Sequence, residues 1–570
     1  MRYPIPRTTT SARWLPGLLL ALAVGGMAGT GPVMAATADT PATANALPTA
    51  DAPATADTPA TADTPATADT PATADGPAAA TATATAAATA AANRTIRNGD
   101  FWRDTSGAPI YSQGGGVLKV GEKYYWYGVK YEEAVGYIAS RKPDGSATKF
   151  NAVTAYSSTD LVNWTSEGEV IKVAAPGKIF ERDAWLGRLG VVYNQRTKKY
   201  VLITQYGSKS AGNGVLFATS DTPTGPFKYD NLQTQVANVN GAATGDQTVF
   251  IDDDGQPYLI FSNSGERRHL YVAPLRASDF LQVGPAKLVH QAPAGGREGN
   301  AMFKHNGLYY FCSSELHGWN ASRSYYMTSP SIDGPYTPER LIKGTENDFS
   351  HVSQNGFFIP VAGGKQGTVL FAGDRWSNYA GNGNGYNIWV PLTFEGTAPV
   401  FHSLSEFSLD ARRGTWQVGK GNNYMLNPGF EADRVAQTGV TGWVVSWTNL
   451  KGPSPTVNVP DSRTGRWALT LAHDQHTMGS AVQNVTLPNG RYTLRAWIKG
   501  SGGQKVARLY AYGHGGPEAA ITLEAARTAW TEVSVPNVDV KNGSVQIGLY
   551  SEGSDGQWLK VDDVSLVAEQ

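Results

Sequence analysis

Three short motifs place an acid or an amide directly before an apolar strand pattern. They are GDQTVF with Asp246, REGNAMF with Glu298 and SQNGFF with Gln354. One polar residue at a strand end is common, but three in equivalent positions indicate that the fold gathers them at one place. Two neighbouring carboxyl groups can act as acid and partner in glycosidic bond hydrolysis. These three residues are therefore the first candidates for catalysis.

Signatures of other chemistries do not appear in the sequence. There is no G-x-S-x-G or H-E-x-x-H motif, and the glycine run Gly114–Gly116 precedes a strand rather than the helix that a phosphate loop requires. The DDDG stretch from Asp252 lacks a closing glutamate, so it is interpreted as a tight turn. Cys312 lies in an apolar strand and is given no chemistry. We expect no metal site and no required cofactor; a structural calcium ion stays open, although no ligand set indicates one.

Charge and composition limit the kind of partner. Lys and Arg total 47, Asp and Glu total 48, and the formal net charge is -1. This balance disfavours nucleic acid and anionic membranes, so a neutral polysaccharide or oligosaccharide is the expected partner. A monomer is expected, and the single cysteine excludes a disulfide within the chain.

The first 93 residues are predicted to lie outside the folded domains. Residues 1–35 have early arginines, a short apolar run and a small residue, Ala35, at a cleavage point, which is typical of a signal peptide. Residues 36–93 are rich in Ala, Thr and Pro and predict a disordered linker. The sequence therefore predicts a secreted or periplasmic protein.

The elements that must position the catalytic candidates are repeated hairpins over residues 94–418. Five hairpin patterns recur about every 50 to 75 residues, with no convincing amphipathic helix, and predict an all-β, five-bladed β-propeller. Innermost strands of a propeller converge on one axis. Asp246, Glu298 and Gln354 should then line one funnel, together with the strand starts at Gln113 and within residues 181–190.

Residues 421–570 lack this repeat and show short alternating strands. They predict a β-sandwich of the jelly-roll kind. Its aromatic residues are assigned partly to the core and partly to sugar stacking, without deciding which; they are Trp443, Trp447, Trp467, Trp497, Tyr510, Tyr512 and Trp558.

The motifs together carry a family resemblance. GGGVLKVGEKYYWYG, YSSTDLVNW, DQTVFIDDDGQPYLIFS, EGNAMFKHNGLYYFCSS, SQNGFF and GDRW resemble, in this order, the propeller of glycoside hydrolase family 43, most closely its exo-β-1,3-galactanase-like branch. The C-terminal NPGFE…GW region is similar to a CenC-type carbohydrate-binding module. The resemblance implies an inverting exo-hydrolase of galactan or arabinogalactan side chains. Glu298 would be the general acid, and Asp246 would raise its pKa and orient it.

The resemblance leaves the catalytic base open. Most family members carry an aspartate at the start of the first blade, whereas this chain has no acid between Asp104 and Glu122. The galactanase-like branch also lacks it, and there a glutamine is thought to hold the attacking water, which here would be Gln354. An amide is a poor base, so a structural hydrogen-bonding role for Gln354 is the alternative.

Two departures from the branch keep other activities open. Val129 follows Gly128 where a glutamate is usual, and Gly187 occupies a second glutamate position that Glu181 matches only with an insertion. An arabinofuranosidase, a galactofuranosidase and a non-catalytic sugar-binding propeller are the alternatives. Candidate substrate contacts are Glu181, Trp185, Trp319 and Trp376, and the tryptophans could equally pack blades.

Overall fold

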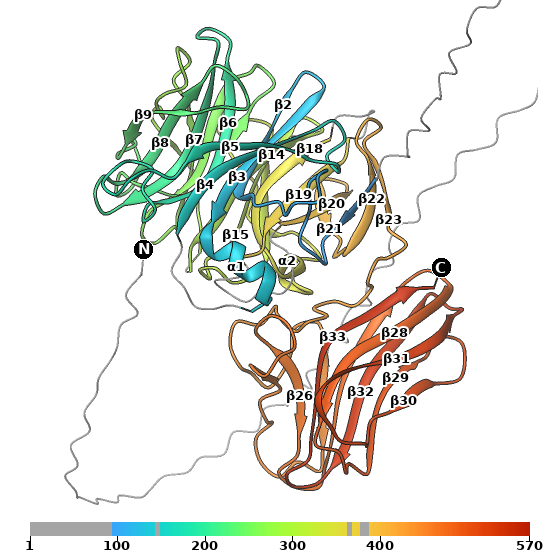
Figure 1. The fold of residues 1–570 in the computed structure, drawn as a ribbon. Helices are drawn as coiled ribbons and strands as arrows, with labels where there is room; N and C mark the ends of the chain where they lie inside the picture. Colours follow the sequence, from blue (N-terminus) through green and yellow to red (C-terminus); the bar gives the residue numbers. More distant parts are fainter. Residues whose placement is uncertain (1–93, 143–148, 294, 362–366, 377–386, 570) are drawn as a thin grey trace, which may run out of the picture.

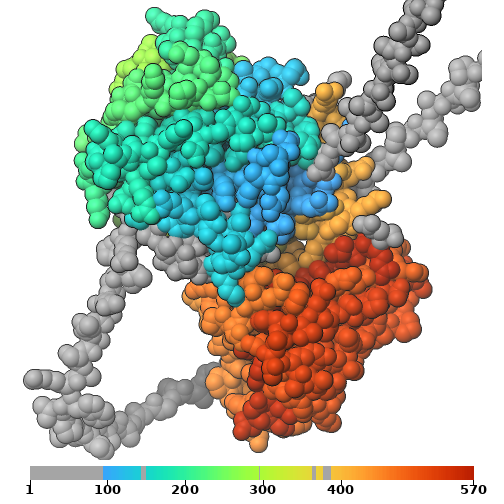
Figure 2. All heavy atoms as spheres, in the orientation of Figure 1, coloured from blue at the N-terminus to red at the C-terminus, as the bar shows by residue number. Residues whose placement is uncertain are grey.

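The computed structural model describes residues 94–569 apart from 143–148, 294, 362–366 and 377–386. The predicted signal peptide and linker lie outside these residues. The chain forms two β-rich domains, which lie against each other (Figures 1 and 2). The prediction of an all-β protein is confirmed.

The N-terminal domain contains five four-stranded antiparallel sheets, each built from four consecutive strands. The first holds β2 (Gln113–Val120), β3 (Lys123–Tyr131), β4 (Phe150–Ser158) and β5 (Thr165–Lys172). The second holds β6 (Trp185–Asn194), β7 (Lys199–Ser208), β8 (Gly212–Ser220) and β9 (Lys228–Gln233). The third holds β10 (Thr244–Ile251), β11 (Pro257–Asn263), β12 (His269–Pro274) and β13 (Lys287–Gln291). The fourth holds β14 (Arg297–His305), β15 (Leu308–Glu315), β16 (Ser324–Ser329) and β17 (Arg340–Leu341). The fifth holds β18 (Gln354–Pro360), β19 (Val369–Asp374), β20 (Asn387–Glu395) and β21 (Ala398–Phe401).

The first strands of these sheets form a closed ring. Strand β2 contacts β6, β6 contacts β10, β10 contacts β14, β14 contacts β18, and β18 returns to β2. Each first strand also has a register break near its start, at Gln113/Gly116, Gly187/Gly190, Thr244/Gln247, Glu298/Ala301 and Asn355/Phe357. Such bulges re-aim side chains and end regular pairing. The ring therefore brings together five strand starts, each of which has an irregular backbone.

A small sixth sheet joins the two ends of this domain. It consists of β1 (Thr95–Arg97), β22 (Glu406–Asp410) and β23 (Thr415–Val418). Next to it, the rings of Trp126 and Trp389 lie 4.9 Å apart and pack the first sheet against the fifth. The DDDG stretch is the turn between β10 and β11, as predicted, with Gly255 at φ +81°.

The N-terminal domain also contains two short helical elements that the sequence pattern did not indicate. Helix α1 (Glu132–Ser140) directly continues β3, and at nine residues it is too short to show a clear amphipathic repeat. Element α2 (Phe349–Val352) is one turn in which all four residues have φ between 52° and 57°. This conformation is left-handed and costs L-residues about 1–2 kcal/mol each, so the surrounding structure must hold it.

The C-terminal domain packs two five-stranded antiparallel sheets around one apolar core. One sheet has the order β24 (Val444–Thr448), β27 (Thr477–Thr486), β32 (Ser544–Gly553), β29 (Val506–Tyr512) and β30 (Ala519–Thr522). The other has the order β25 (Asn458–Val459), β26 (Ala468–Ala472), β33 (Trp558–Ala568), β28 (Gly490–Gly500) and β31 (Arg527–Val540). Among the described residues, no helix is long and apolar enough to cross a membrane.

Both helical elements lie at the end of the N-terminal domain that faces the C-terminal domain (Figure 1). After α1, Lys142 Nζ donates to the backbone oxygen of Ser462 at 2.6 Å. The amide of Gly465 donates to the backbone oxygen of Arg141 at 3.0 Å. The two domains are therefore joined by direct hydrogen bonds as well as by the chain.

Candidate active site

Asp246, Glu298 and Gln354 come together where β10, β14 and β18 begin. Gln354 Nε2 donates to Glu298 Oε1 at 3.0 Å. The guanidinium of Arg188 links Asp246 to Gln354. Its Nε lies 3.1 Å from Asp246 Oδ2, and a terminal nitrogen lies 3.2 Å from Gln354 Oε1. All four side chains are buried. The ring of strand starts thus gathers three residues that lie far apart in the sequence.

Arg188 is the centre of the site, and the reading of the sequence missed it. Besides its bonds to Asp246 and Gln354, it lies 3.2 Å from Asp374 Oδ2 and 3.1 Å from the backbone oxygen of Asn355. It sits in the bulge of β6 with φ +51°, a conformation rare outside glycine. An arginine inside the otherwise apolar GRLGVVYN motif was the available signal, since arginine is buried only when it is paired.

The charges around Glu298 favour its protonated form. Burial, and after it the negative charge of Asp246, raise the pKa of Glu298 above its ordinary value. Burial would also raise the pKa of Asp246, but the positive charges of Arg267 and Arg188 outweigh it and hold that pKa below the ordinary value. Arg267 hydrogen-bonds to Asp246 Oδ1 and lies 3.6 Å from Glu298 Oε2. One carboxyl group is thus kept neutral beside an ionised one.

Gln354 is held at both ends of its amide. Its Nε2 has two N–H donors, and three acceptors lie within hydrogen-bond distance of it: Glu298 Oε1 and the backbone oxygens of Gly318 and Asn320. Its Oε1 accepts from Trp376 Nε1 at 2.9 Å as well as from Arg188. The amide therefore fixes the orientation of Glu298.

The three predicted tryptophans form one aromatic cluster at the site. Trp319 and Trp376 have ring centroids 4.9 Å apart, and Trp185 lies 5.3 Å from Trp319 and 6.4 Å from Trp376. Trp185 also stacks on Tyr131 at 5.4 Å with an interplanar angle of 5°. Trp376 is almost fully buried, whereas Trp185 and Trp319 are half-buried.

The predicted contact Glu181 is engaged elsewhere. Its carboxylate accepts from the amide of Gly177 at 2.7 Å, from Ser208 Oγ at 3.0 Å and from Ser210 Oγ at 2.8 Å. These partners lie in the loop before β6, in β7 and in the turn that follows β7. The structure therefore does not group Glu181 with the hydrogen-bonded set around Glu298.

The glycine run of β2 lets this strand approach its neighbours. A Cβ on Gly115 would overlap the backbone oxygen of Tyr127, and one on Gly116 would lie 3.0 Å from the backbone oxygen of Leu189. The amide of Gly114, at φ +56°, donates to Asp374 Oδ1 at 2.9 Å. Strand β2 thus supplies backbone contacts to the site and no carboxylate.

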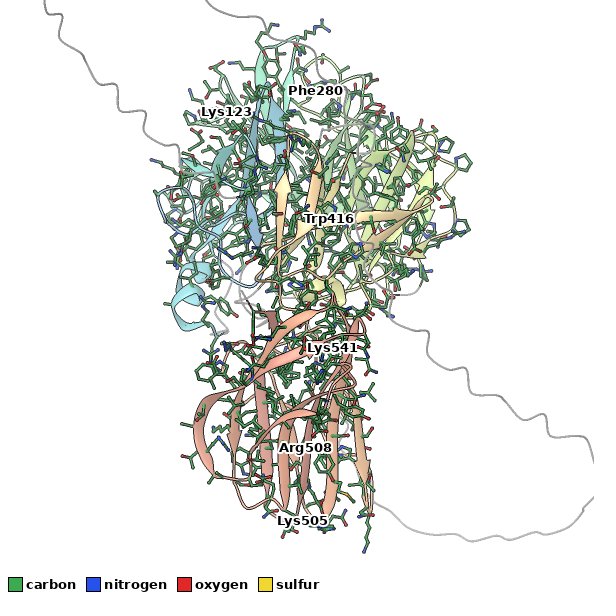
Figure 3. The ribbon with its side chains drawn as sticks, turned by 90° about the vertical axis from the view of Figure 1, so that its right-hand side faces the viewer. Lys123, Phe280, Trp416, Lys505, Arg508 and Lys541 are labelled. Atoms are coloured by element: carbon green, nitrogen blue, oxygen red, sulfur yellow. The ribbon has the colours of Figure 1, made fainter. Side chains whose placement is uncertain are left out.

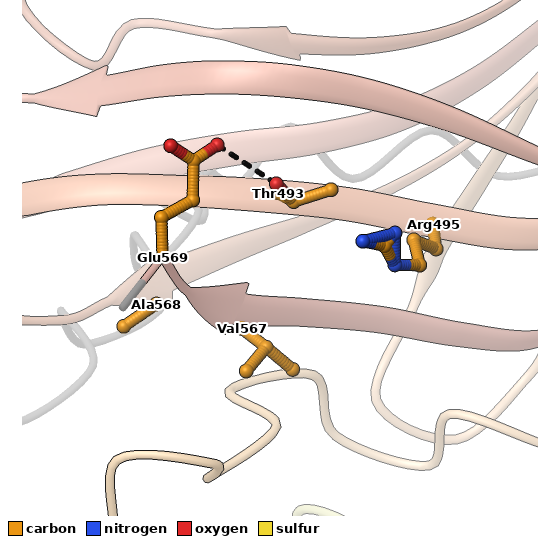
Figure 4. A pocket seen from close by; sticks show the side chains of 5 residues that line it. All are labelled: Thr493, Arg495, Val567, Ala568 and Glu569. Carbon is orange, nitrogen blue, oxygen red and sulfur yellow. Dashed lines mark hydrogen bonds between the residues drawn. The ribbon is translucent and has the colours of Figure 1, made fainter.

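Two cavities lie apart from the residues around Glu298. One of about 470 Å³ lies between the domains and includes His351, Arg375 and Glu431. The other, about 400 Å³, lies at the edge of the C-terminal domain, where Glu569 accepts from Thr493 Oγ1 at 2.8 Å (Figure 4). Within the described residues, no group of three or more His, Cys, Asp or Glu side chains could hold a metal ion.

Comparisons with known proteins relate the N-terminal domain to carbohydrate-cleaving enzymes. Residues 114–379 match the model of glycosyl hydrolases family 43. The chain is 30% identical over 217 residues to a beta-D-galactofuranosidase of Aspergillus niger, covering 36% of this chain and 62% of that protein. It is 27% identical over 223 residues to an arabinoxylan arabinofuranohydrolase of Bacillus subtilis, covering 34% of this chain and 42% of that protein. The chain thus spans less than two thirds of either relative.

Two solved structures are similar in fold to this chain over most of its length. An exo-beta-1,3-galactanase of Phanerochaete chrysosporium has a TM-score of 0.52 and 24% identity, covering 83% of this chain and 100% of that one. An exo-beta-1,3-galactanase of Clostridium thermocellum has a TM-score of 0.50 and 21% identity, covering 84% of this chain and 100% of that one.

Proposed function

We propose, from the match of residues 114–379 to the model of glycosyl hydrolases family 43 and from the site described above, that the chain is an inverting exo-hydrolase of galactan or arabinogalactan side chains. The observation that carries the proposal is Glu298, a buried carboxyl group with a raised pKa beside an ionised Asp246. Such an acid can still donate its proton near neutral pH. It would protonate the leaving glycosidic oxygen while water attacks the anomeric carbon from the opposite face.

In this proposal Asp246 acts on the substrate only through Glu298, and two arginines keep Asp246 in its charged form. Its negative charge keeps the proton on Glu298, and Arg188 and Arg267 keep Asp246 itself ionised. Arg188 also holds Gln354, so one guanidinium aligns both neighbours of the acid.

Gln354 remains the candidate for holding the attacking water. Both ends of its amide are engaged, so this role requires one of its present bonds to open. Its hydrogen bond to Glu298 supports the simpler role of orienting the acid. The two roles differ in what Gln354→Glu would do. A carboxylate could act as a base and keep some activity, whereas it would disturb a purely orienting amide by its negative charge beside Glu298.

The proposed substrate unit is galactosyl. The Aspergillus niger relative is named a galactofuranosidase, and the two structures of similar fold are named exo-beta-1,3-galactanases. Both names describe enzymes that act on galactose-containing bonds. Trp185 and Trp319 are half-buried in the cluster with Trp376, which donates to Gln354, and they offer aromatic faces for stacking against a sugar ring.

A furanosidase is the second candidate. Both curated relatives described above carry names of enzymes acting on furanose sugars, galactofuranose in one and arabinofuranose in the other. A non-catalytic sugar-binding domain is less well supported, because a domain that only binds sugar does not need an acid such as Glu298, which a neighbouring negative charge keeps protonated.

We also propose that the five sheets are the blades of a five-bladed propeller and that the C-terminal domain is a β-sandwich that binds carbohydrate. Its aromatic residues divide: Trp443 and Trp467 are buried in the core, whereas Tyr510 lies on the outer face of β29. A Cβ on Gly548 would overlap the Tyr510 ring, so the ring lies across the neighbouring strand. Arg508, labelled in Figure 3, lies 5.0 Å from the same ring. An aromatic ring lying on a sheet face suits stacking with sugars.

Export belongs to the same proposal, since a polysaccharide cannot enter the cell. A domain that retains the polymer would raise the effective concentration of chain ends at Glu298.

Purified protein tests the proposal on β-1,3-galactan and on aryl galactofuranoside and arabinofuranoside, with Glu298→Gln as the control. We expect wild-type protein to release galactose from the galactan and the variant to lose activity about 100-fold or more. Cleavage of only a furanoside would move the assignment to the second candidate. Sugar binding without cleavage of any substrate would refute catalysis.

A further inference from the structure

Arg434 of the C-terminal domain contacts a loop that lies beside the candidate active site. We propose that Arg434 is a positioning residue, which holds the loop of residues 316–323 in the arrangement that Glu298 and Gln354 need; the catalytic part of this inference rests on the proposed function. The loop connects β15 and β16. Arg434 lies in the segment before β24, in the other domain.

The inner side of the loop belongs to the site. The amide of His317 donates to Glu298 Oε1 at 3.1 Å. The backbone oxygens of Gly318 and Asn320 accept from Gln354 Nε2. Trp319 supplies one of the three tryptophans of the aromatic cluster, where it packs edge-on against the other two. Four consecutive residues of this loop therefore set the surroundings of the acid, the amide and the aromatic cluster.

The outer side of the loop rests on Arg434. Its Nε and one terminal nitrogen both donate to the backbone oxygen of Ala321, at 3.2 and 2.9 Å. The terminal nitrogen also lies 3.5 Å from Glu315 Oε2, at the end of β15. Hydrogen bonds from His317, Arg323 and Tyr325 outweigh burial and keep the pKa of Glu315 below its ordinary value. The partner of Arg434 thus stays charged, and the arginine ties down both ends of the loop.

Arg434 also covers the strained turn that leads into Gln354. Its guanidinium lies 4.6 Å from the ring centroid of Phe349, the first residue of the left-handed turn α2. Ala432, two residues earlier, packs with Ala321 and Val352. Unfavourable backbone persists only where its surroundings fix it. One short segment of the C-terminal domain therefore braces the two segments that position the amide of Gln354.

Other contacts between the domains lie apart from this loop and provide a matched control. Lys142 Nζ donates to the backbone oxygen of Ser462 at 2.6 Å and to its Oγ at 3.0 Å. Removing this side chain also takes one cation from the interface between the same two domains. A general loosening of the interface would affect Arg434 and Lys142 variants alike, whereas loop positioning would affect only the former.

The experiment compares Arg434→Ala, Arg434→Lys and Lys142→Ala in the full chain. Two readouts are used: kcat and KM on the substrate of the wild type, and the circular dichroism of the coupled tryptophans 185, 319 and 376. We expect Arg434→Ala to lower kcat about 10- to 100-fold, because small misplacement of catalytic groups has effects of this size. Its tryptophan signal should change as well. Arg434→Lys keeps the charge but loses the paired donors, so an intermediate loss is expected. Lys142→Ala should match the wild type in both readouts.

The outcomes separate the two proposals. If Arg434→Ala matches Lys142→Ala in kcat and in the tryptophan signal, positioning by Arg434 is refuted. If the wild type cleaves no substrate, the proposed function fails, and the tryptophan signal alone then tests whether Arg434 positions the loop. If Arg434→Ala does not fold, the same two readouts on Arg434→Lys decide, because lysine retains the charge at the interface.

Discussion

Replacing Asp246 by Asn tests the electrostatic arrangement of the site. The substitution keeps the shape of the side chain but removes the negative charge that raises the pKa of Glu298. It also leaves the positive charges of Arg188 and Arg267 without this counter-ion. Both changes favour ionised Glu298. The pKa of Glu298 should therefore fall in the variant.

The size of the shift follows from the geometry. Arg267 hydrogen-bonds to Asp246 and lies 3.6 Å from Glu298 Oε2, which places the two carboxyl groups close to a common nitrogen. For charges about 6 Å apart and an effective dielectric constant of about 20, the interaction is about 3 kcal/mol, or about two pKa units. A general acid works only while protonated, so activity falls as pH rises through its pKa. The alkaline limb of kcat/KM should move down by about two pH units. Because the pKa of Glu298 is raised to about 8 in the wild type, activity at pH 7 should fall about 10-fold, and at higher pH up to about 100-fold.

The assay is the pH profile of kcat/KM on whichever substrate the wild type cleaves. Infrared difference spectra of the protonated carboxyl group give the pKa of Glu298 directly, with Glu298→Gln identifying its band. Asp252→Asn is the matched control, because Asp252 pairs with Lys304 at the tip of the β10–β11 hairpin, outside the hydrogen-bonded site. An alkaline limb that stays in place, or moves to higher pH, in Asp246→Asn would refute this account of the acid.

Three further predictions concern stability and binding. Arg188→Met should lower the free energy of unfolding by about 3–5 kcal/mol in urea titrations, because it removes the cation that pairs with buried Asp374 and one of the two that pair with Asp246. A loss below about 1 kcal/mol would contradict a central role for Arg188. Gly299→Ala should lower the melting temperature of the protein more than Gly121→Ala does. Both glycines have positive φ, but of the two only Gly299 lies where a Cβ would overlap a backbone oxygen. Equal melting temperatures would contradict the close approach of the backbone at Gly299. Tyr510→Ala should weaken retention on insoluble polysaccharide in pull-down assays while kcat/KM on a small aryl glycoside stays unchanged; unchanged retention would remove this face as the binding surface.

The three catalytic candidates were accessible from the sequence because their signal is local. Each lies at the start of an apolar strand, and the hairpin repeat makes those positions equivalent, so Asp246, Glu298 and Gln354 could be grouped before any coordinates. The tryptophans could be named, but the sequence could not separate sugar contact from packing. Glu181 was suggested by motif alignment, but it bonds to Gly177 in the loop before β6 and to serines at the end of β7 and in the turn after it.

The arginines were missed for a physical reason. Arg188 acts by bridging residues from the third and fifth sheets, and Arg267 acts by lying between two carboxyl groups. A positive charge in one strand gives no sign of which distant carboxylates will surround it. Helix α1 was missed because nine residues carry too little periodicity, and the left-handed turn α2 contradicts the preference of every residue in it.

By itself, the sequence determined the all-β character of the chain, the hairpin repeat and the residues that stand at the strand starts, because strand alternation and turn chemistry act over a few residues. Tertiary structure alone decided the protonation pattern and the brace across the domains. A pKa depends on burial and on charges brought in from other sheets, and the contact of Arg434 with the loop of residues 316–323 joins positions more than 100 residues apart.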